Sequence, residues 1–278
     1  MNFLVLDEVP SWQQKVYRLQ IQMEGDAFLK KIVTDYSWWT LDECDVYQRE
    51  TVSHMLMTEL MGFTLLLQTD DNKREFITKA LPNPEVTKDN VESYADAILD
   101  TLALMRNRRN TALDRLTPSV LSDLFSQKAT QANVKAHLID EFCSFVQSWE
   151  RTFGSEICFV HGDFHPGNIL QAEDGTFYPF DFEEAIESLP AFDGANISHE
   201  IHRRCGEAAY EYFKSRYQRR FGEPLIDWRD WGRFRHLRGW IARCYLEQCC
   251  DARTMELAKA FIEGHEPETV DAKAEPEF

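Results

Sequence analysis

Residues 1–81 alternate apolar and polar side chains in short runs, which is the pattern of half-buried strands. Two of these runs are separated by a turn signal at Glu24–Asp26 and two more by a turn signal at Asp71–Lys73, so each pair predicts a hairpin. The stretch between the hairpins is helix-like. The predicted elements are strands over Lys15–Met23 and Ala27–Val33, a helix over Asp42–Met61, and strands over Phe63–Asp71 and Arg74–Leu81.

From Pro82 onward, the spacing of apolar residues becomes that of amphipathic helices. One such helix includes Val134–Trp149 and closes near Gly154. Residues 264–278 are acidic, contain proline and are poor in apolar side chains, so we expect a disordered tail. Further helices are predicted over His199–Phe221, Trp228–Cys250 and Arg253–Glu263. The pattern therefore predicts an α+β chain, with a β-rich part over 1–81, a helical part over 82–263 and a tail over 264–278.

Composition narrows the class of protein. The 278 residues carry 47 acidic and 30 basic side chains, and the net charge of −17 argues against nucleic-acid binding, which needs Lys and Arg to neutralise phosphates. No apolar run approaches the roughly 20 residues of a membrane span, and the N-terminus lacks the features of a signal peptide. The seven cysteines contain no C-x-x-C pair, so we expect reduced thiols in a cytoplasmic protein.

Candidate chemistry is concentrated in the segment FVHGDFHPGNIL, residues Phe159–Leu170. Asp163 can accept a proton from an attacking hydroxyl, and Asn168 offers an amide oxygen to a hard cation such as Mg²⁺. Asp181 lies between aromatic residues in YPFDFEE, where a carboxylate without a partner is costly. A turn at Glu173–Gly175 makes the intervening chain a hairpin. The three side chains are therefore predicted to converge.

Two other interpretations of this segment stay open. His161, Asp163 and His165 alternate and could bind zinc, although no further cluster with ligand spacing follows. An aspartate and an asparagine in one loop could also be turn formers only. The longer combination H-G-D-x-H-x-x-N, followed by an aspartate among apolar residues, is more specific than either. We expect His161 to brace the loop backbone.

HGDFHPGN together with FDFEE resembles the catalytic and metal-binding segments of the aminoglycoside phosphotransferase/choline kinase family, which has a two-lobed, protein-kinase-like fold. The resemblance implies a small antiparallel-sheet N-lobe and a larger, mostly helical C-lobe. It also implies that Asp163 is catalytic and that Asn168 and Asp181 bind Mg²⁺ beside ATP. In such a site we expect His165 to pack on the loop or to touch the phosphate.

The resemblance further implies a strand lysine that binds the ATP phosphates and a helix glutamate that pairs with this lysine. Lys30 fits the lysine position, because it lies between apolar residues, whereas Lys31 points to the other face and is the weaker candidate. Glu50 fits the glutamate position, and Glu43 is a rival.

The resemblance further implies a linker that binds adenine through its backbone and a loop that covers the phosphates. The linker is matched by Thr78, Lys79 and Leu81. The phosphate loop corresponds to Leu6–Lys15, which contains no glycine, so Ser11 is the expected donor. Asp193 matches a family aspartate whose role would be structural, as an N-cap and loop anchor.

These implications describe an ATP-dependent phosphotransferase that moves the γ-phosphate to a hydroxyl of a small molecule. A catalytically inactive kinase-like binding module is an alternative, because the glycine-rich loop is missing, and a protein Ser/Thr kinase is a weaker one, because no activation segment is recognisable. The oligomeric state is not predicted.

Acidic residues in the second half of the chain bear on the charge of the acceptor. If several of them face the cleft, they favour a cationic acceptor, such as an aminoglycoside or an amino alcohol. The acids concerned are Glu183, Glu184, Glu187, Asp227, Asp230, Glu247 and Asp251.

Overall fold

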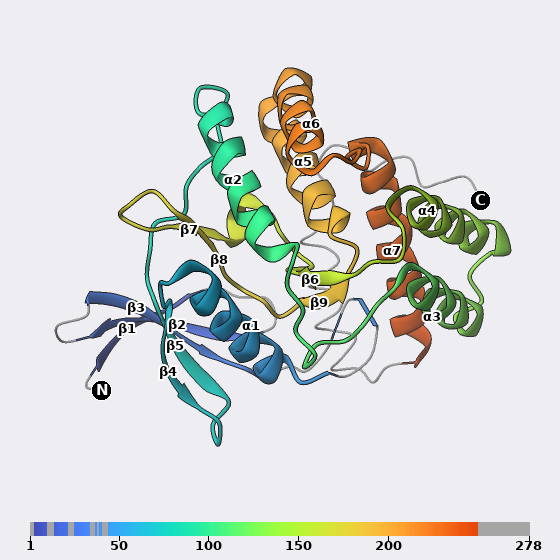
Figure 1. Cartoon of the computed structure of the whole chain (residues 1–278). Helices are drawn as coiled ribbons and strands as arrows, with labels where there is room; N and C mark the ends of the chain where they lie inside the picture. Colours follow the sequence, from blue (N-terminus) through green and yellow to red (C-terminus); the bar gives the residue numbers. More distant parts are fainter. Residues whose placement is uncertain are drawn as a thin grey trace.

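The computed structural model describes residues 3–9, 14–21, 25–33, 37, 39–40 and 44–249. A five-stranded sheet lies at one end of the molecule, and most of the helices gather at the other end (Figure 1). The elements of the sheet end are β1 (Phe3–Val9), β2 (Lys15–Ile21), β3 (Gly25–Lys31), α1 (Val46–Met61), β4 (Leu66–Asp70) and β5 (Glu75–Lys79).

Both predicted hairpins are confirmed, because β2 pairs antiparallel with β3 and β4 pairs antiparallel with β5. The strand order is β1-β2-β3-β5-β4, so β3 is the central strand, with Lys30 opposite Val16 on one side and Phe76 on the other. The edge strand β1 is not predicted by the alternation of the sequence. Its consecutive residues Leu4 and Val5 are 62% and 50% exposed, so no face of it is regularly buried.

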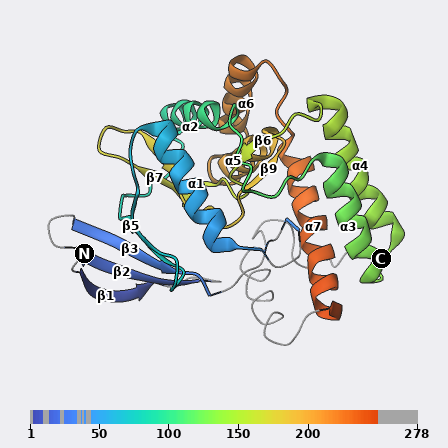
Figure 2. The same cartoon turned by 60° about the horizontal axis from the view of Figure 1, so that its bottom comes forward.

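Helix α1 connects the two ends of the molecule (Figure 2). It begins after Asp45, whose side chain accepts a hydrogen bond from the Gln48 N–H, and it ends at Gly62 in the left-handed conformation. Its first turn packs against the sheet through Val46. Its later turn places Met57 in a cluster with aromatic residues of the helical end. The predicted start of this helix, Asp42, lies outside the described residues.

The helical end contains two short two-stranded sheets between its third and fourth helices. Its helices are α2 (Val91–Met105), α3 (Pro118–Gln131), α4 (Ala136–Phe153), α5 (Ala191–Cys205), α6 (Glu207–Phe221) and α7 (Trp228–Cys249). Its strands and short 3₁₀ turn are β6 (Cys158–Val160), η1 (Pro166–Asn168), β7 (Ile169–Gln171), β8 (Phe177–Pro179) and β9 (Ile186–Ser188). β6 pairs with β9 and β7 pairs with β8. Within the ranges that the structure describes, no helix combines the length and apolarity of a membrane span.

Aromatic side chains fill the core between α4, α5 and α7. Phe142, Phe192, Trp231 and Phe234 are buried there, with Phe192 and Trp231 ring centroids 5.5 Å apart. Such aromatic pairs stabilise a core beyond the area that they bury. The core therefore fixes how α5 and α7 lie beside the loop that follows β6.

The single helix predicted over His199–Phe221 is wrong in its extent. The structure has two helices there, α5 and α6, which are separated at Gly206 with a φ of 88°. That conformation suits glycine and breaks the helical hydrogen-bond ladder. The helix predicted over Arg253–Glu263 and the expected tail lie outside the described residues.

The α+β class is confirmed by the antiparallel sheet at one end and the helices at the other. Cysteines in the described part are free thiols, as expected from their spacing: Cys44, Cys143, Cys158, Cys205 and Cys244.

Candidate active site

The loop that carries Asp163, which we call the Asp163 loop (His161–Asn168), follows β6 directly. Gly162 has a φ of 84°, and a Cβ added there would lie 1.9 Å from the Glu184 carbonyl oxygen. Glycine is therefore required at this position both by the backbone conformation and by the close approach of another segment. The glycine of the HGD sequence is therefore required for steric reasons, in addition to the chemical role expected of the aspartate.

His161 braces the backbone around this loop. Its ring is fully buried, and Nε2 lies 2.9 Å from the carbonyl oxygen of Phe180. Burial lowers the pKa of His161, so the ring is neutral at pH 7, donates from Nε2 and can accept the Asp163 N–H at Nδ1 (3.4 Å). The expected bracing role is consistent with this placement.

Asp193 ties the same loop to α5. Its carboxylate accepts hydrogen bonds from the His161 N–H (2.8 Å) and the Gly162 N–H (3.1 Å). Burial raises the pKa of Asp193 to about 7, although both backbone bonds act in the opposite direction. The expected anchor is found, but the expected N-cap is not, because Pro190 precedes the helix and Asp193 lies in its first turn.

The Asp163 carboxylate is held by three polar side chains. Asn168 Nδ2 lies 3.4 Å from Oδ2, His165 Nε2 lies 3.4 Å from the same oxygen, and Asn196 Nδ2 lies 3.5 Å from Oδ1. Burial acts to lower the pKa of His165, but the charge and hydrogen bond of Asp163, together with the charge of Glu200, raise the net pKa. Asn196, on α5, in turn accepts a hydrogen bond from Trp231 on α7 (3.2 Å). This side of Asp163 is therefore bordered by α5 and α7.

The zinc arrangement that the sequence left open is not formed. His161 directs Nε2 at a backbone carbonyl, whereas His165 lies against Asp163 and accepts the Gly167 N–H at Nδ1. Among the residues with described positions, one group of three carboxylate, thiol or imidazole ligands converges, and it consists of Glu50, Asp181 and Glu183.

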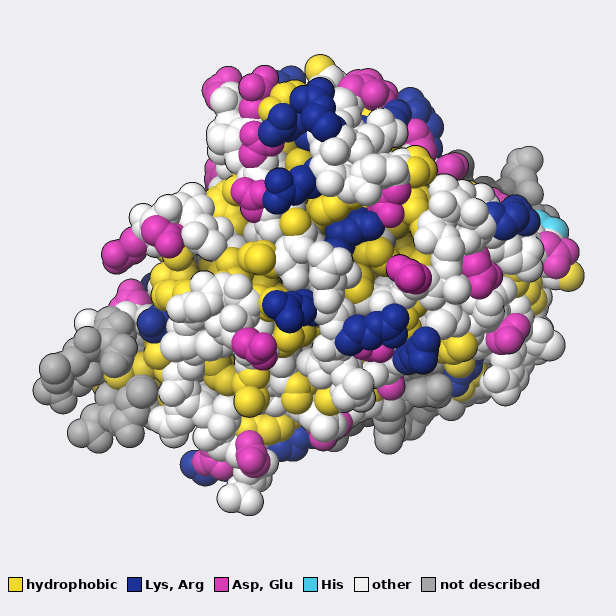
Figure 3. Space-filling model, viewed as in Figure 1, with side chains coloured by type: hydrophobic (Ala, Val, Ile, Leu, Met, Phe, Trp, Pro, Cys, Tyr) yellow, Lys and Arg dark blue, Asp and Glu magenta, His cyan; other side chains and the backbone are white. Residues whose placement is uncertain are grey.

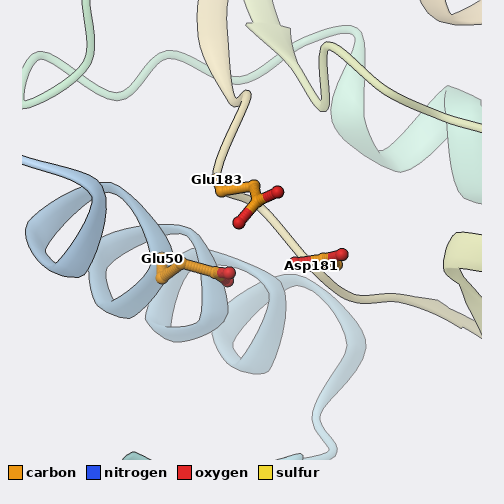
Figure 4. A group of neighbouring side chains, drawn as sticks. All are labelled: Glu50, Asp181 and Glu183. Atoms are coloured by element: carbon orange, nitrogen blue, oxygen red, sulfur yellow. The ribbon is translucent and has the colours of Figure 1, made fainter. Parts of the chain in front are cut away.

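Lys30 lies at the centre of this acidic group, which we call the Lys30 cluster (Lys30, Glu50, Asp181 and Glu183). Its ammonium nitrogen contacts Glu50 at 2.5 Å, Asp181, and Glu183 at 3.4 Å. Glu50 projects from α1 toward the two acids that follow β8 (Figure 4). Lys31, one residue later on β3, bonds Glu75 at 3.1 Å on the other side of the strand. The structure therefore brings Lys30, rather than Lys31, into the site, and Glu43 lies outside the described residues.

The Lys30 cluster holds more negative than positive charge. Burial raises the pKa of Glu50 to about 7, against the lowering effect of Lys30. Burial likewise raises the pKa of Glu183 to about 7. Burial acts to lower the pKa of Lys30, but the surrounding acids raise it well above its usual value. Three carboxylates around one ammonium group leave an excess of oxygen ligands that suits a hard divalent cation.

Asn168 and Asp181 meet at the mouth of the β7–β8 hairpin. Ile169 pairs with Pro179, and the Phe180 N–H donates to the Asn168 carbonyl oxygen at 3.1 Å. The Nδ2 of Asn168 is used by Asp163, whereas its Oδ1 makes no hydrogen bond to any described residue. The hairpin therefore brings Asp181 near Asn168 and Asp163, as predicted. The amide oxygen of Asn168 and the carboxylate of Asp181 are ligand types that Mg²⁺ prefers.

Glu183 was expected near the acceptor, and the structure places it in the Lys30 cluster instead. No regular pattern in the sequence reveals this, because Asp181 has a φ of 66° and Glu183 lies in a turn, so strand alternation does not apply to this segment. Gln14 completes the arrangement, with Nε2 3.5 Å from Glu183 and Oε1 accepting the Val33 N–H at 2.8 Å.

Arg49 fixes the segment after Asp181 from the side of α1. It is buried, and it donates to the Glu183 carbonyl oxygen (2.9 Å) and to Asp114 (2.6 Å). Asn83 has a similar role at the other end of the site, because its Nδ2 donates to the carbonyl oxygens of Pro166 (2.8 Å) and Ile169 (2.7 Å). Neither residue belongs to the motifs, and no sequence signal indicated them.

The predicted adenine linker follows β5. The Lys79 N–H donates to Leu65 and the Ala80 N–H to Asp26, so these two donors are used within the sheet. Thr78 is paired within the sheet opposite Phe28. Leu81 packs beside the core of the helical end, and its backbone groups make no backbone hydrogen bond to a described residue. Ser11, the expected phosphate donor, lies outside the described residues.

Several of the other acids that favoured a cationic acceptor have structural partners or are buried, whereas Asp230 is exposed in the first turn of α7. Glu187 accepts the Asn110 N–H (2.8 Å), Asp227 accepts the Arg229 N–H (2.9 Å), and Glu184 is buried. The side chain of Glu247 and the whole of Asp251 lie outside the described part. On the face seen in Figure 3, acidic side chains are interspersed with basic ones. The expectation of an acidic acceptor side is therefore not supported by these residues.

Comparison with known proteins finds a matching family and solved structures with a similar fold. The model of a family described as the phosphotransferase enzyme family matches residues 58–237. No curated protein sequence matches the chain. Among solved structures, the macrolide 2′-phosphotransferase MphH from Brachybacterium faecium is 15% identical with a TM-score of 0.63, over 95% of this chain and 93% of that one.

Two further solved structures share the fold. The choline kinase LicA from Streptococcus pneumoniae is 13% identical with a TM-score of 0.63, over 95% of each chain. A mutant of aminoglycoside phosphotransferase APH(4)-Ia, in complex with ADP and hygromycin B, is 12% identical with a TM-score of 0.56, over 96% of this chain and 95% of that one. The predicted fold of the aminoglycoside phosphotransferase/choline kinase family is thereby confirmed.

Proposed function

Because the chain belongs to the phosphotransferase enzyme family, we propose that it transfers the γ-phosphoryl group of ATP to a hydroxyl of a small molecule. The observation that carries the proposal is the convergence of the Lys30 cluster and the Asp163 loop at the mouth of the β7–β8 hairpin. Phosphoryl transfer depends mostly on positioning and on charge neutralisation, and these two groups of residues supply both.

Asp163 is the proposed catalytic residue. The acceptor oxygen attacks the γ-phosphorus, the bond from that phosphorus to the bridging oxygen breaks, and ADP leaves with the electron pair of that bond. The proton of the acceptor hydroxyl passes to a carboxylate oxygen of Asp163. The bonds from Asn168 and Asn196 orient this carboxylate.

Lys30 is proposed to bind the α- and β-phosphates, with Glu50 holding its ammonium group in place. The linker residues Thr78, Lys79 and Leu81 are proposed to border the adenine, with the backbone of Leu81 as the group left free to bind it. Ser11 stays a prediction as the donor that covers the phosphates.

Asn168 and Asp181 are the proposed ligands of Mg²⁺, and Glu183 is near enough to Asp181 to contribute. The bound cation supplies neutralisation of the phosphate charge, which a single lysine cannot provide alone. Because Lys30 contacts Asp181, a phosphate that bound the ammonium group of Lys30 would leave the Asp181 carboxylate available to hold the cation.

We assign nucleotide binding to residues 1–81 and the acceptor site to residues 82–263, with no role for 264–278. A small-molecule acceptor is supported by the solved structures with this fold, whose names specify macrolides, choline and aminoglycosides. The cytoplasmic location remains a prediction from the cysteines, and nucleic acid is not a proposed partner. A cationic acceptor was favoured by the sequence, but the contacts of the acids that suggested it no longer favour it.

The test is the Mg²⁺-dependent binding of ATP, measured by calorimetry with Asp181→Asn. We expect the variant to lose the metal-dependent part of the affinity, because it removes a charged oxygen ligand. Asp123→Asn, an exposed change on α3, is the control and should bind as the wild type does. Unchanged metal-dependent binding in Asp181→Asn would reject the assigned site. Binding without turnover of any hydroxyl compound would favour the inactive binding module.

A further inference from the structure

Two arginines lie beside the acceptor side of Asp163. Asn196 contacts both Asp163 and Trp231, so this part of α7 borders the site. Arg235 and Arg238 follow Trp231 by four and seven residues, a spacing that places all three on one face of a helix. The side of α7 that contacts Asn196 therefore carries two arginines over the next two turns.

Arg238 is held in place but keeps an unused donor. Its guanidinium lies over the ring of Trp39, 4.3 Å from the centroid. Its Nη1 is buried and has no hydrogen-bond partner among the residues that the structure describes, and the same is true of Trp39 Nε1. A Cβ on Gly162 would lie 2.9 Å from that indole nitrogen, so the stacked pair adjoins the residue before Asp163. Buried donors without an acceptor are rare and costly, which points to a ligand that supplies acceptor oxygens.

Arg235 is not neutralised by a carboxylate of its own. Among the described residues, the acid that pairs with Arg235 is Glu200, 3.9 Å away, and Glu200 also pairs with Arg203 (2.9 Å), Arg204 (3.6 Å) and His199 (3.7 Å). One carboxylate therefore serves three guanidinium groups. A second negative charge is needed to balance this part of the site.

The electrostatic interactions around Arg238 also favour an anionic ligand. Burial lowers the pKa of Arg238 to about 10, and the positive charge of Arg235 contributes, against the opposite effect of Glu184 and Asp163. A cationic acceptor would have to lie against these groups, whereas an anion would relieve their repulsion.

We propose that the acceptor carries an oxyanion, a carboxylate or a phosphate, which binds to Arg238 and Arg235 while its hydroxyl points at Asp163. This inference rests on the proposed function and specifies the substrate class of the same site. Guanidinium groups bind such anions through paired hydrogen bonds. The net charge of −17 does not oppose it, because exposed charges are screened over about 8 Å at physiological ionic strength.

The test uses four small compounds with a common framework: glycerate, glycerol 3-phosphate, glycerol and 3-aminopropane-1,2-diol. Their dissociation constants are measured by calorimetry on the full chain with Mg²⁺ and ADP present, so that the phosphate sites of the nucleotide are filled. We expect the better of the two anions to bind at least about tenfold more tightly than glycerol or the aminodiol, as charge-assisted hydrogen bonds of this kind allow. The two anions distinguish a carboxylate from a phosphate.

Arg238→Gln and Arg235→Gln should each remove most of this preference and leave ADP affinity unchanged. Arg229→Gln, which deletes the same charge near the start of α7 where the guanidinium is exposed, is the matched control and should keep the preference. Three results would overturn the inference: tighter binding of the aminodiol, binding of none of the four, or an anion preference that survives the loss of both arginines. Loss of ADP binding in Arg238→Gln would overturn it as well, because the arginine would then face the donor. Failure of the wild type to bind ADP would instead count against the proposed function.

Discussion

Around Lys30, three carboxylates surround one ammonium group. On the α5 and α7 side of Asp163, by contrast, Arg235 pairs with a carboxylate that also serves other arginines, and Arg238 stacks on Trp39. The first arrangement has an excess of negative charge and suits a metal cation. The second has unused cationic donors and suits an anion. The two regions lie on either side of the Asp163 loop and are held by different elements, α1 and the β7–β8 hairpin for one and α5 with α7 for the other.

The difference shows that net charge says little about the charge of a binding site. The chain as a whole is strongly acidic, and its acids near Asp181 first favoured a cationic acceptor. The contacts instead assign Glu183 to Lys30 and Glu187 to a backbone amide. Local pairing, rather than the sum over the chain, decides which ligand each region can hold.

The largest expected effect concerns the residue between the two regions. Asp163→Asn should lower kcat by about a hundredfold or more, because it removes the proton acceptor. Nucleotide affinity should change little, because the Lys30 cluster does not contain Asp163. Steady-state kinetics and calorimetry with Mg²⁺-ATP measure the two effects separately. Asp123→Asn serves as control, and loss of ATP binding in a folded Asp163→Asn protein would make Asp163 a ligand of the nucleotide or metal.

Much of the donor region could be predicted from the sequence because its residues lie in short patterns. Lys30 is marked by strand alternation, and Asp163, Asn168 and Asp181 are joined by a hairpin whose turn is visible in the sequence. Each of these relations involves residues that are near in sequence or opposite in a hairpin. Local geometry therefore fixes their positions.

The acceptor region could not be predicted in this way. Arg238 meets Trp39 across about 200 positions of sequence, and Asn196 reaches Asp163 only because the aromatic core orients α5. Arg49 and Asn83 likewise act through long-range contacts. Such contacts depend on how helices pack, and a single sequence does not encode the packing in a local pattern.

A second prediction concerns the close approach at Gly162. Gly162→Ala should lower the free energy of unfolding by about 2–4 kcal/mol, since overpacking adds to the cost of a positive φ. Gly175→Ala is the matched control, because Gly175 has a φ of 88° and nothing within 4 Å of an added Cβ. It should cost about 1–2 kcal/mol, the backbone part alone. Urea denaturation measures both. Equal losses would mean that Glu184 and Trp39 can move away, and that the two regions are not locked together there.

The smallest expected effect tests the excess negative charge of the Lys30 cluster through pH. The pKa of Glu183 is raised to about 7 by burial, so the folded state holds its proton more tightly than the unfolded state, where the ordinary value is 4.5. Its contribution to stability is therefore largest below about pH 4.5 and is lost as the pH rises toward 7. Glu183→Gln resembles the protonated acid. Without nucleotide or Mg²⁺, it should melt like the wild type at pH 5 and a few degrees higher at pH 8, since about 1 kcal/mol corresponds to roughly 2–4 °C for a chain of this size.

Glu75→Gln, which faces Lys31 on the other side of β3, controls for the loss of an acid, and its Tm difference from the wild type should not show this dependence on pH. A lower Tm for Glu183→Gln at pH 8 would show that the Glu183 carboxylate stabilises Lys30, and that the cluster carries no excess charge for a metal to neutralise.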